Sequence, residues 1–297
     1  MNILITGSSG FIGHNLVKKL RSDHEIFTID KRETRGELSD QHFVCDLSDY
    51  SCLSRIDNPI DIVYHFGSAS SILSYRGNEA QLADLEIHQF VNILRFSKKK
   101  RVKKFIYPST ASLYSSNSQG KGNVLNPLNI YAAVKFTEEQ IARHYNGNTK
   151  TLGLRIFMAY GPGEESKGAR ASPISLFLHN ILKGESPLIF GDGSQTRDPI
   201  FIDDLVNILT SVLYKPGITG VRDVCTGDLI SFNDIISIIN RVATTNITPK
   251  YVSRPKSYIE GATGDSSFAK EMLGRDFTSI DDGIRSMICV FKNKSNK

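Results

Sequence analysis

Several features are absent or scarce in this chain of 297 residues: it has no tryptophan, four methionines and four cysteines. The cysteines (Cys45, Cys52, Cys225 and Cys289) form no C-x-x-C pair and no metal-type spacing with histidine, so we expect free thiols and no bound metal. No apolar run approaches the roughly 20 residues that cross a bilayer. Since the first predicted strand begins at the second residue, we expect no signal peptide. These absences favour a soluble, cytoplasmic protein.

Positive charge exceeds negative charge only slightly. The 36 lysines and arginines against 31 aspartates and glutamates give a formal net charge of +5. Much of this excess lies in residues 98–104 and 292–297, where a solvated helix end and a terminal tail are the simplest explanation. We therefore expect no nucleic-acid partner.

The first half of the chain alternates between short apolar runs and amphipathic segments. The pattern predicts strands at residues 2–6, 25–30, 42–45, 61–66, 104–108 and 151–157, and helices at 12–21, 79–98 and 131–145. This alternation predicts an α/β fold, a doubly wound parallel sheet with helices on both faces. We place this domain at residues 1–157 and a smaller α/β domain at 158–297. The chain is expected to return to the first domain near 199–215, and to its sheet at 199–202.

Three glycines spaced by three, Gly7, Gly10 and Gly13, follow the first predicted strand and lead into an apolar helix that starts with Phe11 and Ile12. Such a turn presents the N–H groups of a helix N-terminus to an anion, here a dinucleotide pyrophosphate. The spacing G-x-x-G-x-x-G resembles that of the short-chain dehydrogenase/reductase superfamily rather than the G-x-G-x-x-G of ordinary dehydrogenases.

The second predicted strand ends in a carboxylate, Asp30, about 20 residues beyond the glycines. A carboxylate there accepts hydrogen bonds from ribose hydroxyls and repels a 2′-phosphate, which favours NAD over NADP. Lys31 and Arg32 weaken this preference, because nearby cations can hold the phosphate. The alternative interpretation of Asp30 is an ordinary turn residue at a strand end.

A tyrosine and a lysine stand four residues apart in the segment Tyr131-Ala-Ala-Val-Lys135, so they lie on one face of a predicted helix. A free tyrosine, with a pKa of about 10, is a poor base at neutral pH. An adjacent ammonium stabilises the phenolate, and Thr110 after the fifth strand offers a hydroxyl that relays the proton. This arrangement predicts catalytic roles for Thr110, Tyr131 and Lys135. A chance Tyr–Lys pair is the alternative.

These motifs resemble, in order, those of the extended short-chain dehydrogenase/reductases, the NAD-dependent nucleotide-sugar epimerase/dehydratase family. The matching segments are TGSSGFIG, Asp30, CDLSD, YHFGSAS, VKKFIYPSTASLY, YAAVK, LRIFMAYGPG, IFGDGSQTRDPIFIDD and GDSSFAKEMLGRDFTSIDDGI. The resemblance covers essentially the whole chain. It implies a Rossmann-type first domain, a tightly held NAD and a nucleotide-sugar substrate, such as a UDP-sugar.

The resemblance also implies binding residues. The cofactor would contact Gly7, Gly10, Phe11, Ile12, Gly13, Asp30, Lys31, Asp46, Leu47, Phe66, Gly67, Ser68, Pro108, Tyr131, Lys135 and Phe157. The substrate would contact Ser112, Tyr131, Met158, Arg197 and Arg254. The two arginines would bind the diphosphate, since guanidinium donors match phosphate oxygens. A surface ion pair is the alternative role for either arginine.

Three positions depart from the family's pattern. Met158 replaces an asparagine near the sugar nucleotide, Pro199 replaces an aromatic residue, and Glu86 replaces an asparagine on the cofactor side. Sugar 4,6-dehydratases carry Asp-Glu directly after the catalytic threonine, where this chain has Ala111-Ser112. Neither residue can act as that acid–base pair, so dehydration is not expected.

The leading hypothesis is an NAD-dependent UDP-sugar 4-epimerase that works through a transient 4-keto sugar. The alternative is a nucleotide 4-keto-sugar reductase, which Met158 and the cations Lys31 and Arg32 favour. A non-catalytic dinucleotide-binding protein is a more distant hypothesis, because the tyrosine, the lysine and the threonine are all present.

Two predicted helices keep apolar residues on more than one face, among them Ile87, Phe90 and Val91 in the segment 79–98. One face must cover the sheet, which leaves another for a partner. Together with the family resemblance, this predicts a two-fold homodimer through a four-helix bundle of the segments 79–98 and 131–146.

Overall fold

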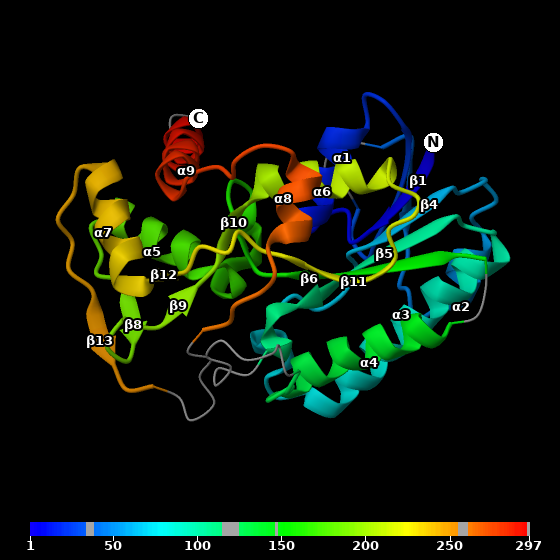
Figure 1. Ribbon diagram of the computed structural model, residues 1–297, viewed down its shortest axis with the longest axis horizontal. Helices are drawn as coiled ribbons and strands as arrows, with labels where there is room; N and C mark the ends of the chain where they lie inside the picture. Colours follow the sequence, from blue (N-terminus) through cyan, green and yellow to red (C-terminus); the bar gives the residue numbers. More distant parts are fainter. Residues whose placement is uncertain (34–38, 115–124, 146–147, 255–260, 296–297) are drawn as a thin grey trace. The chain divides into compact units, whose positions relative to one another are not determined.

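The structure is a computed structural model in which residues 1–33, 39–114, 125–145, 148–254 and 261–295 are described (Figure 1). Its strands are β1 (Asn2–Thr6), β2 (Glu25–Asp30), β3 (Gln41–Val44), β4 (Ile62–His65), β5 (Lys104–Thr110), β6 (Lys150–Ile156), β7 (Met158–Tyr160), β8 (Leu188–Phe190), β9 (Thr196–Arg197), β10 (Pro199–Phe201), β11 (Gly220–Val224), β12 (Ile230–Ser231) and β13 (Lys250–Val252). Its α-helices are α1 (Phe11–Leu20), α2 (Tyr50–Ser54), α3 (Glu79–Lys99), α4 (Ile130–His144), α5 (Pro173–Leu182), α6 (Ile202–Leu213), α7 (Phe232–Ala243), α8 (Ser267–Leu273) and α9 (Ile280–Ser295). Short 3₁₀-helices are η1 (Ile72–Tyr75), η2 (Ala111–Leu113) and η3 (Glu164–Arg170).

The chain divides into two compact units. The first comprises Met1–Leu113, Pro127–Arg155 and Ile208–Arg222. The second comprises Tyr114–Asn126, Ile156–Asn207 and Asp223–Lys297. The glycine turn and the Tyr–Lys pair thus belong to the first unit, and both candidate diphosphate arginines belong to the second.

A seven-stranded sheet has the order β3-β2-β1-β4-β5-β6-β11. Its strands from β3 through β5 pair in parallel. Helices α2, α3 and α4 lie on one face of this sheet, and α1 and α6 lie on the other (Figure 1). The predicted doubly wound α/β fold is confirmed. The strand order reverses between β1 and β4, the position where such sheets bind ligands at the carboxyl ends of their strands.

The sheet is buried on both faces. Leu4 and Val63 belong to one apolar cluster with Phe90 of α3. In β4, Tyr64 is fully buried, and its hydroxyl donates to the carbonyl of Leu209 in α6 over 2.5 Å. Burial on both faces explains why these strands are continuous apolar runs in the sequence rather than alternating patterns.

The predicted return of the chain to this sheet at residues 199–202 is wrong. Residues Pro199–Phe201 form β10, which pairs in parallel with β7 in a separate two-stranded sheet. The strand that joins the edge of the main sheet is β11. Pro199 has no N–H group to donate to a neighbouring strand. It is therefore tolerated as the first residue of a short edge strand but not inside the ladder of a larger sheet.

The second unit is built around a helix layer and short sheets. Helix α7 packs against α5 and α9, and the ring of Phe177 meets the ring of Phe232 edge-on with centroids 5.5 Å apart. Two further sheets pair β9 with β12 and β8 with β13. Asp204 in α6 is fully buried, accepts a hydrogen bond from the backbone N–H of Thr278 over 2.7 Å and pairs with Arg275. This carboxylate fixes the segment that leads into α9.

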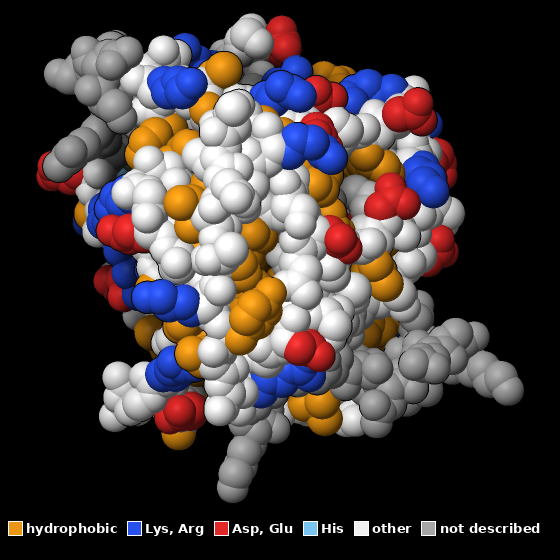
Figure 2. Space-filling model, turned by 90° about the vertical axis from the view of Figure 1, so that its left-hand side faces the viewer, with side chains coloured by type: hydrophobic (Ala, Val, Ile, Leu, Met, Phe, Trp, Pro, Cys, Tyr) orange, Lys and Arg blue, Asp and Glu red, His pale blue; other side chains and the backbone are white. Residues whose placement is uncertain are grey.

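The surface shown in Figure 2 carries both signs of charge. Lysine and arginine side chains alternate there with aspartate and glutamate, and hydrophobic side chains are scattered between them (Figure 2). Positive charge is therefore not gathered into a single stripe on this face. Within the described part of the chain, every helix is too short or too polar to cross a membrane.

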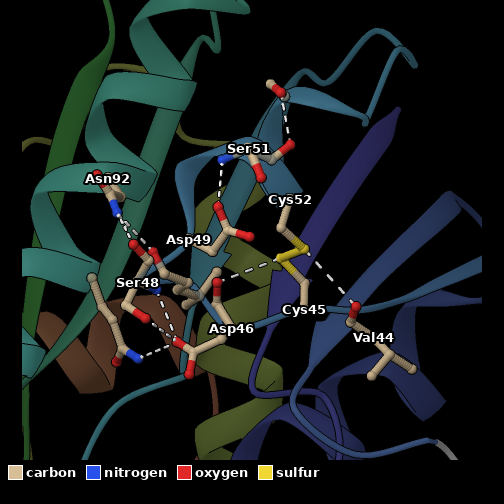
Figure 3. The surroundings of a disulfide bond; sticks show 11 residues. Val44, Cys45, Asp46, Ser48, Asp49, Ser51, Cys52 and Asn92 are labelled. Carbon is tan, nitrogen blue, oxygen red and sulfur yellow. Dashed lines mark hydrogen bonds between the residues drawn. A yellow bond between two sulfur atoms is a disulfide. The ribbon is translucent and has the colours of Figure 1, made fainter.

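Two of the four cysteines form a disulfide, which corrects the expectation of free thiols at these positions (Figure 3). Cys45 follows β3 and Cys52 lies in α2, and their Cα atoms are 5.9 Å apart. The turn between them brings the two together, because Asp49 caps α2 by accepting a hydrogen bond from the backbone N–H of Ser51 over 2.9 Å. The spacing of the two cysteines in the sequence does not reveal this turn. Cys225 and Cys289 are free.

Candidate active site

The glycine turn after β1, called the glycine cradle below, is packed so tightly against neighbouring backbone that side chains would not fit. Gly7 has a φ of +68°, and a Cβ atom there would collide with the carbonyl oxygen of Phe66. A Cβ at Gly13 would collide with the carbonyl of Gly7. Gly10 is the N-cap of α1, and no side chain caps the helix there. The start of α1 is therefore a candidate anion site.

The carboxylate of Asp30 closes this turn from β2. Its Oδ2 accepts a hydrogen bond from the backbone N–H of Ser9 over 3.0 Å, and its Oδ1 accepts one from the backbone N–H of Arg32 over 3.1 Å. Lys31 points to another carboxylate, with its Nζ 3.1 Å from Oδ2 of Asp46. The guanidinium Nε of Arg32 lies 3.4 Å from Oδ1 of Asp30, so both cations have acidic partners, which reduces their capacity to hold a 2′-phosphate.

Asp46 is fixed between the end of β3 and α3. It accepts hydrogen bonds from the backbone and side chain of Ser48 at 2.9 and 2.8 Å and from Gln89 at 3.0 Å. Partial burial alone would raise the pKa of Asp46, but these donors and Lys31 lower it to about 2. Asp46 is therefore charged at any physiological pH.

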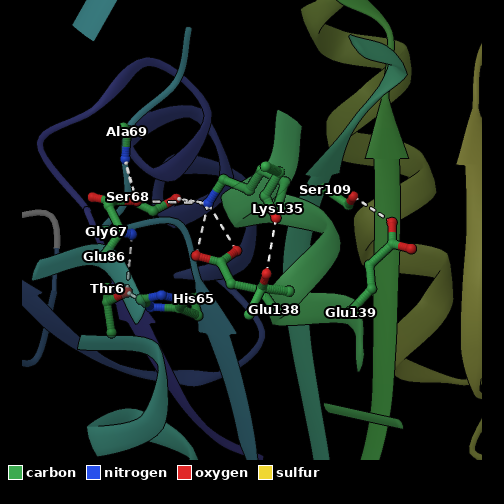
Figure 4. Close-up of polar contacts among 12 residues, drawn as sticks. Thr6, His65, Gly67, Ser68, Ala69, Glu86, Ser109, Lys135, Glu138 and Glu139 are labelled. Atoms are coloured by element: carbon green, nitrogen blue, oxygen red, sulfur yellow. Dashed lines mark hydrogen bonds and ion pairs between the residues drawn. The ribbon is translucent and has the colours of Figure 1, made fainter. Parts of the chain in front are cut away.

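The ends of β1, β3 and β4 converge at Gly67. The backbone N–H of Gly67 donates to Oγ1 of Thr6 over 3.0 Å, and Thr6 in turn bonds Nδ1 of His65 at 2.9 Å (Figure 4). A Cβ atom on Gly67 would lie 3.2 Å from both the backbone nitrogen of Gly7 and a methyl group of Leu47. The structure therefore brings together three motifs that are far apart in the sequence.

Tyr131 lies in the first turn of α4, where the side chain of Asn129 caps the helix by accepting from the backbone N–H of Ala132 over 2.9 Å. Burial raises the pKa of the Tyr131 phenol, whereas Lys135 and a hydrogen bond with Thr110 lower it, and the net direction is upward. Thr110 thus acts on the Tyr131 phenol in the direction that the proposed role requires. The effect of Lys135 on Tyr131 has the expected sign, but burial outweighs it.

Lys135 is buried among polar partners (Figure 4). Its Nζ donates to Oγ of Ser68 over 3.0 Å and to Oε2 of Glu138 over 2.9 Å, and it lies 3.7 Å from Oε2 of Glu86. The sequence motifs left Glu138 out, although it stands three residues after Lys135 and hence on the same helix face. Glu86, the residue in place of the family's asparagine, also accepts from the backbone N–H of Ala69 over 2.9 Å.

Two of the residues that depart from the family's pattern lie next to each other in the structure. Met158 and Pro199 are directly paired across β7 and β10, and both are half-buried. Near them, the ring of Phe157 packs against Tyr114 with centroids 6.1 Å apart. The remaining first-unit candidates, Pro108 and Ser112, lie at and just beyond the end of β5 and are also half-buried.

Both candidate diphosphate arginines lie at the glycine loop of the second unit. Gly191 has a φ of +85°, and a Cβ atom there would collide with the side chain of Arg254. Arg254 also bonds Oδ1 of Asp192 over 2.8 Å. Arg197 follows the loop in β9, where its guanidinium lies over the ring of Phe232, 5.1 Å from the centroid.

An apolar surface that the motifs left out precedes this loop. Leu188 and Phe190 of β8 are 48% and 39% exposed and share a face of the strand, since side chains two apart point to the same side. Val252 of β13 pairs with Phe190 and is also exposed. These exposed apolar side chains come directly before the glycine loop on β8 and two residues before Arg254 on β13.

A sequence profile of the NAD dependent epimerase/dehydratase family matches residues 3–221. The chain belongs to this family. It is 29% identical over 252 residues to the ADP-L-glycero-D-manno-heptose-6-epimerase of Alkalilimnicola ehrlichii, with 78% of each chain covered. It is 28% identical to a Bacillus subtilis protein named as an uncharacterized UDP-glucose epimerase, with 97% of each covered.

Solved structures of epimerases have the same fold over the whole chain. The UDP-glucose 4-epimerase of Thermotoga maritima, solved with UDP-glucose, has a TM-score of 0.89 and 26% identity, and the match covers 99% of this chain and 100% of that one. The UDP-glucuronic acid 4-epimerase of Bacillus cereus, solved with UDP-glucuronic acid and NAD, has a TM-score of 0.86 and 25% identity at the same coverage. The names of these relatives differ in nucleotide, sugar and reacting carbon, so membership of the NAD-dependent family leaves the substrate open.

The residues of this chain fit the family's cofactor. Gly7 and Gly13 let the backbone of the turn pack closely against its neighbours, and the start of α1 has no side-chain cap, which together suit a pyrophosphate. Asp30 stands at the end of β2, where a ribose is expected, and Lys135 and Tyr131 stand on α4.

Proposed function

We propose that this protein is an NAD-dependent nucleotide-sugar 4-epimerase, with a UDP-hexose or UDP-N-acetylhexosamine as substrate. The observation that carries the proposal is the buried set of Tyr131, Thr110 and Lys135, in the same unit as the glycine cradle. Relatives named as 4-epimerases of UDP-sugars, with the same fold over the whole chain, support it.

Tyr131 is the acid–base residue of this proposal. Its phenolate takes the proton of the sugar's C4 hydroxyl, and Thr110, which lowers the pKa of Tyr131, aligns the C4 hydroxyl or relays the proton. Lys135 keeps the phenolate accessible by its positive charge. NAD held at the glycine cradle and Asp30 would supply the acceptor for the C4 hydride and the source of its return to the opposite face of the 4-keto sugar. Tyr131 then gives the proton back.

Arg197 and Arg254 are the proposed ligands of the nucleoside diphosphate. Both lie at the glycine loop, and a guanidinium group can donate two parallel hydrogen bonds to phosphate oxygens. To bind a phosphate, Arg254 must give up part of its contact with Asp192. Hydrogen bonds from Ser194 and the charge of Arg254 lower the pKa of Asp192 to about 2. The exposed face with Leu188 and Phe190 would take the base.

The direct test is to incubate the purified protein with UDP-glucose, UDP-galactose or their N-acetyl forms and to separate the products by chromatography. The expected result is conversion to the C4 epimer with no net change in NADH absorbance, because the cofactor is regenerated. NAD should also be recovered from the denatured protein. Net consumption of NADH or NADPH with a 4-keto sugar, without epimerisation, would contradict the proposal.

A second candidate function is nucleotide 4-keto-sugar reduction. It is favoured by the paired substitutions Met158 and Pro199, which remove an asparagine and an aromatic residue at one place. The same acid–base residues would then serve one net hydride transfer. Dehydration is disfavoured, because Thr110 is followed in η2 by Ala111 and Ser112, which supply no acid–base pair.

A further inference from the structure

Lys135 is enclosed by two carboxylates that the proposed chemistry does not require. Its Nζ is 2.9 Å from Oε2 and 3.2 Å from Oε1 of Glu138, and 3.7 Å from Oε2 of Glu86. We propose that Glu86 and Glu138 are positioning residues that hold Lys135 and offset its positive charge at Tyr131. The effect of these carboxylates on catalysis rests on the proposed function, whereas their contacts with Lys135 are observed independently of it.

When Glu138 is ionised, the charges in this cluster do not balance. One ammonium faces two carboxylates, and the side chains of Lys135, Glu138 and Glu86 are only 1%, 1% and 5% exposed. Water therefore screens the excess negative charge poorly, and its effect reaches neighbouring groups. The Lys135 ammonium also donates a hydrogen bond to the Ser68 hydroxyl, which carries no charge.

Each member of the cluster responds to the others. Burial lowers the pKa of Lys135, but Glu138 and Glu86 raise it overall, so Lys135 stays protonated. Burial raises the pKa of Glu138 to about 7 against the opposing effect of Lys135. Glu138 and Glu86 both raise the pKa of Tyr131, after the larger effect of burial, while Lys135 lowers it. The carboxylates thus oppose the action of Lys135 on the phenol.

The other groups around the cluster carry little charge toward Tyr131. From β4, His65 is neutral, because burial and Lys135 lower its pKa to about 3. From η1, the ring of Tyr75 lies 6.0 Å from that of Tyr131, and burial raises the pKa of Tyr75, so it is a neutral phenol. From α4, Glu139 pairs with Arg155 over 2.7 Å.

The two carboxylates therefore make Tyr131 a base that works at a higher pH than it would with neutral residues at these positions. The family's asparagine at position 86 supplies the natural comparison, because its amide carries no charge. When Tyr131 titrates, Glu138 is already ionised, since its pKa is lower. Removing either charge must lower the pKa of Tyr131.

The test measures the phenolate fraction of Tyr131 directly. Protein labelled with ¹³C at the tyrosine Cζ is compared by NMR at the highest pH at which circular dichroism shows all variants folded, and the Tyr131 signal is assigned by its loss in Tyr131→Phe. Glu138→Gln and Glu86→Asn should each increase the phenolate fraction, and the double variant should increase it further. Glu138→Asp keeps the charge and should match the parent. Asp84→Asn, which removes an exposed charge from the same helix as Glu86, is the control and should also match it.

Equal phenolate fractions in the parent, Glu138→Gln and Glu86→Asn would overturn the proposal. If the protein is an active epimerase, the acid limb of kcat/KM should also move to lower pH in Glu138→Gln, a change that a merely structural role would not produce. The NMR result needs no turnover. If the variants raise the phenolate fraction but the protein has no epimerase activity, the role of the two carboxylates stands and the proposed function is rejected. If the protein is an active epimerase but the phenolate fractions are unchanged, the proposed function stands and the role of the carboxylates is rejected.

Discussion

At the residue scale, the hydroxyl of Tyr131 carries the proposed proton transfer. Tyr131→Phe removes it while keeping the ring, which is 7% exposed and packs with Val134 and Tyr75. Because a positioned acid–base group contributes typically 10²–10⁴-fold, we expect turnover to fall by about that factor. Binding of NAD and UDP should change little. Initial rates and calorimetric titration check both, and turnover equal to the parent's would exclude Tyr131 as the base.

Tyr75 presents the opposite case, a hydroxyl without a partner among the described residues. It is 1% exposed, and its oxygen makes no hydrogen bond there. Leaving a buried polar group unsatisfied costs about 1–3 kcal/mol, so Tyr75→Phe should increase the free energy of unfolding by about 1 kcal/mol. Urea denaturation of the two proteins measures this. A clear loss of stability would show that the hydroxyl has a partner in solution.

At the element scale, the glycine loop at 191–195 and strand β9 form the proposed diphosphate site. Arg197→Ala should weaken UDP binding by about 1.5–3 kcal/mol, roughly ten- to hundredfold, because a charge-assisted contact is lost. NAD binding should be unaffected, since the glycine cradle belongs to the other unit. Calorimetric titration with UDP and with NAD separates the two effects. Arg222→Ala, an exposed arginine of β11, is the matched control. Equal UDP affinities for parent and Arg197→Ala would move the nucleotide site elsewhere.

The elements themselves were largely predictable from the sequence. Strands at 2–6 and 25–30 agree with β1 and β2, and the helix predicted at 131–145 is α4, Ile130–His144. These segments carry their own signals: apolar runs for strands buried on both faces, and an asparagine cap for the helix.

Contacts that depend on long-range packing were not predictable in this way. The pairing of β10 with β7 and the Cys45–Cys52 disulfide arise from how the chain turns between segments. Glu138 illustrates the same limit in the site. Its spacing from Lys135 was visible, but burial beside Glu86, from a helix some fifty residues earlier, was not. The roles of the site residues stay predictions, and what the structure adds is that Thr110 and Lys135 both lower the pKa of Tyr131 while burial raises it.

At the scale of the whole molecule, helices α3 and α4 offer a face for a second copy of the chain. Phe90 is buried in the sheet core, whereas the next residue, Val91, is 39% exposed. Leu128, which precedes α4, and Ile130, its first residue, are 58% and 37% exposed. Burying such residues on both sides of a two-fold axis would remove apolar area from water twice. We therefore predict a homodimer through α3 and α4.

Light scattering coupled to size exclusion at micromolar concentration should give twice the chain mass of 33.0 kDa. In a dimer, Val91→Glu would bury one unpaired carboxylate from each copy in an apolar contact near the two-fold axis. The variant should therefore shift the protein toward the monomer. Leu229→Glu adds the same charge at a residue of the second unit that is 44% exposed, and it should leave the mass unchanged. A monomeric parent would exclude the dimer. A dimer that survives Val91→Glu but dissociates in Leu229→Glu would place the interface on the second unit and leave α3 and α4 facing solvent.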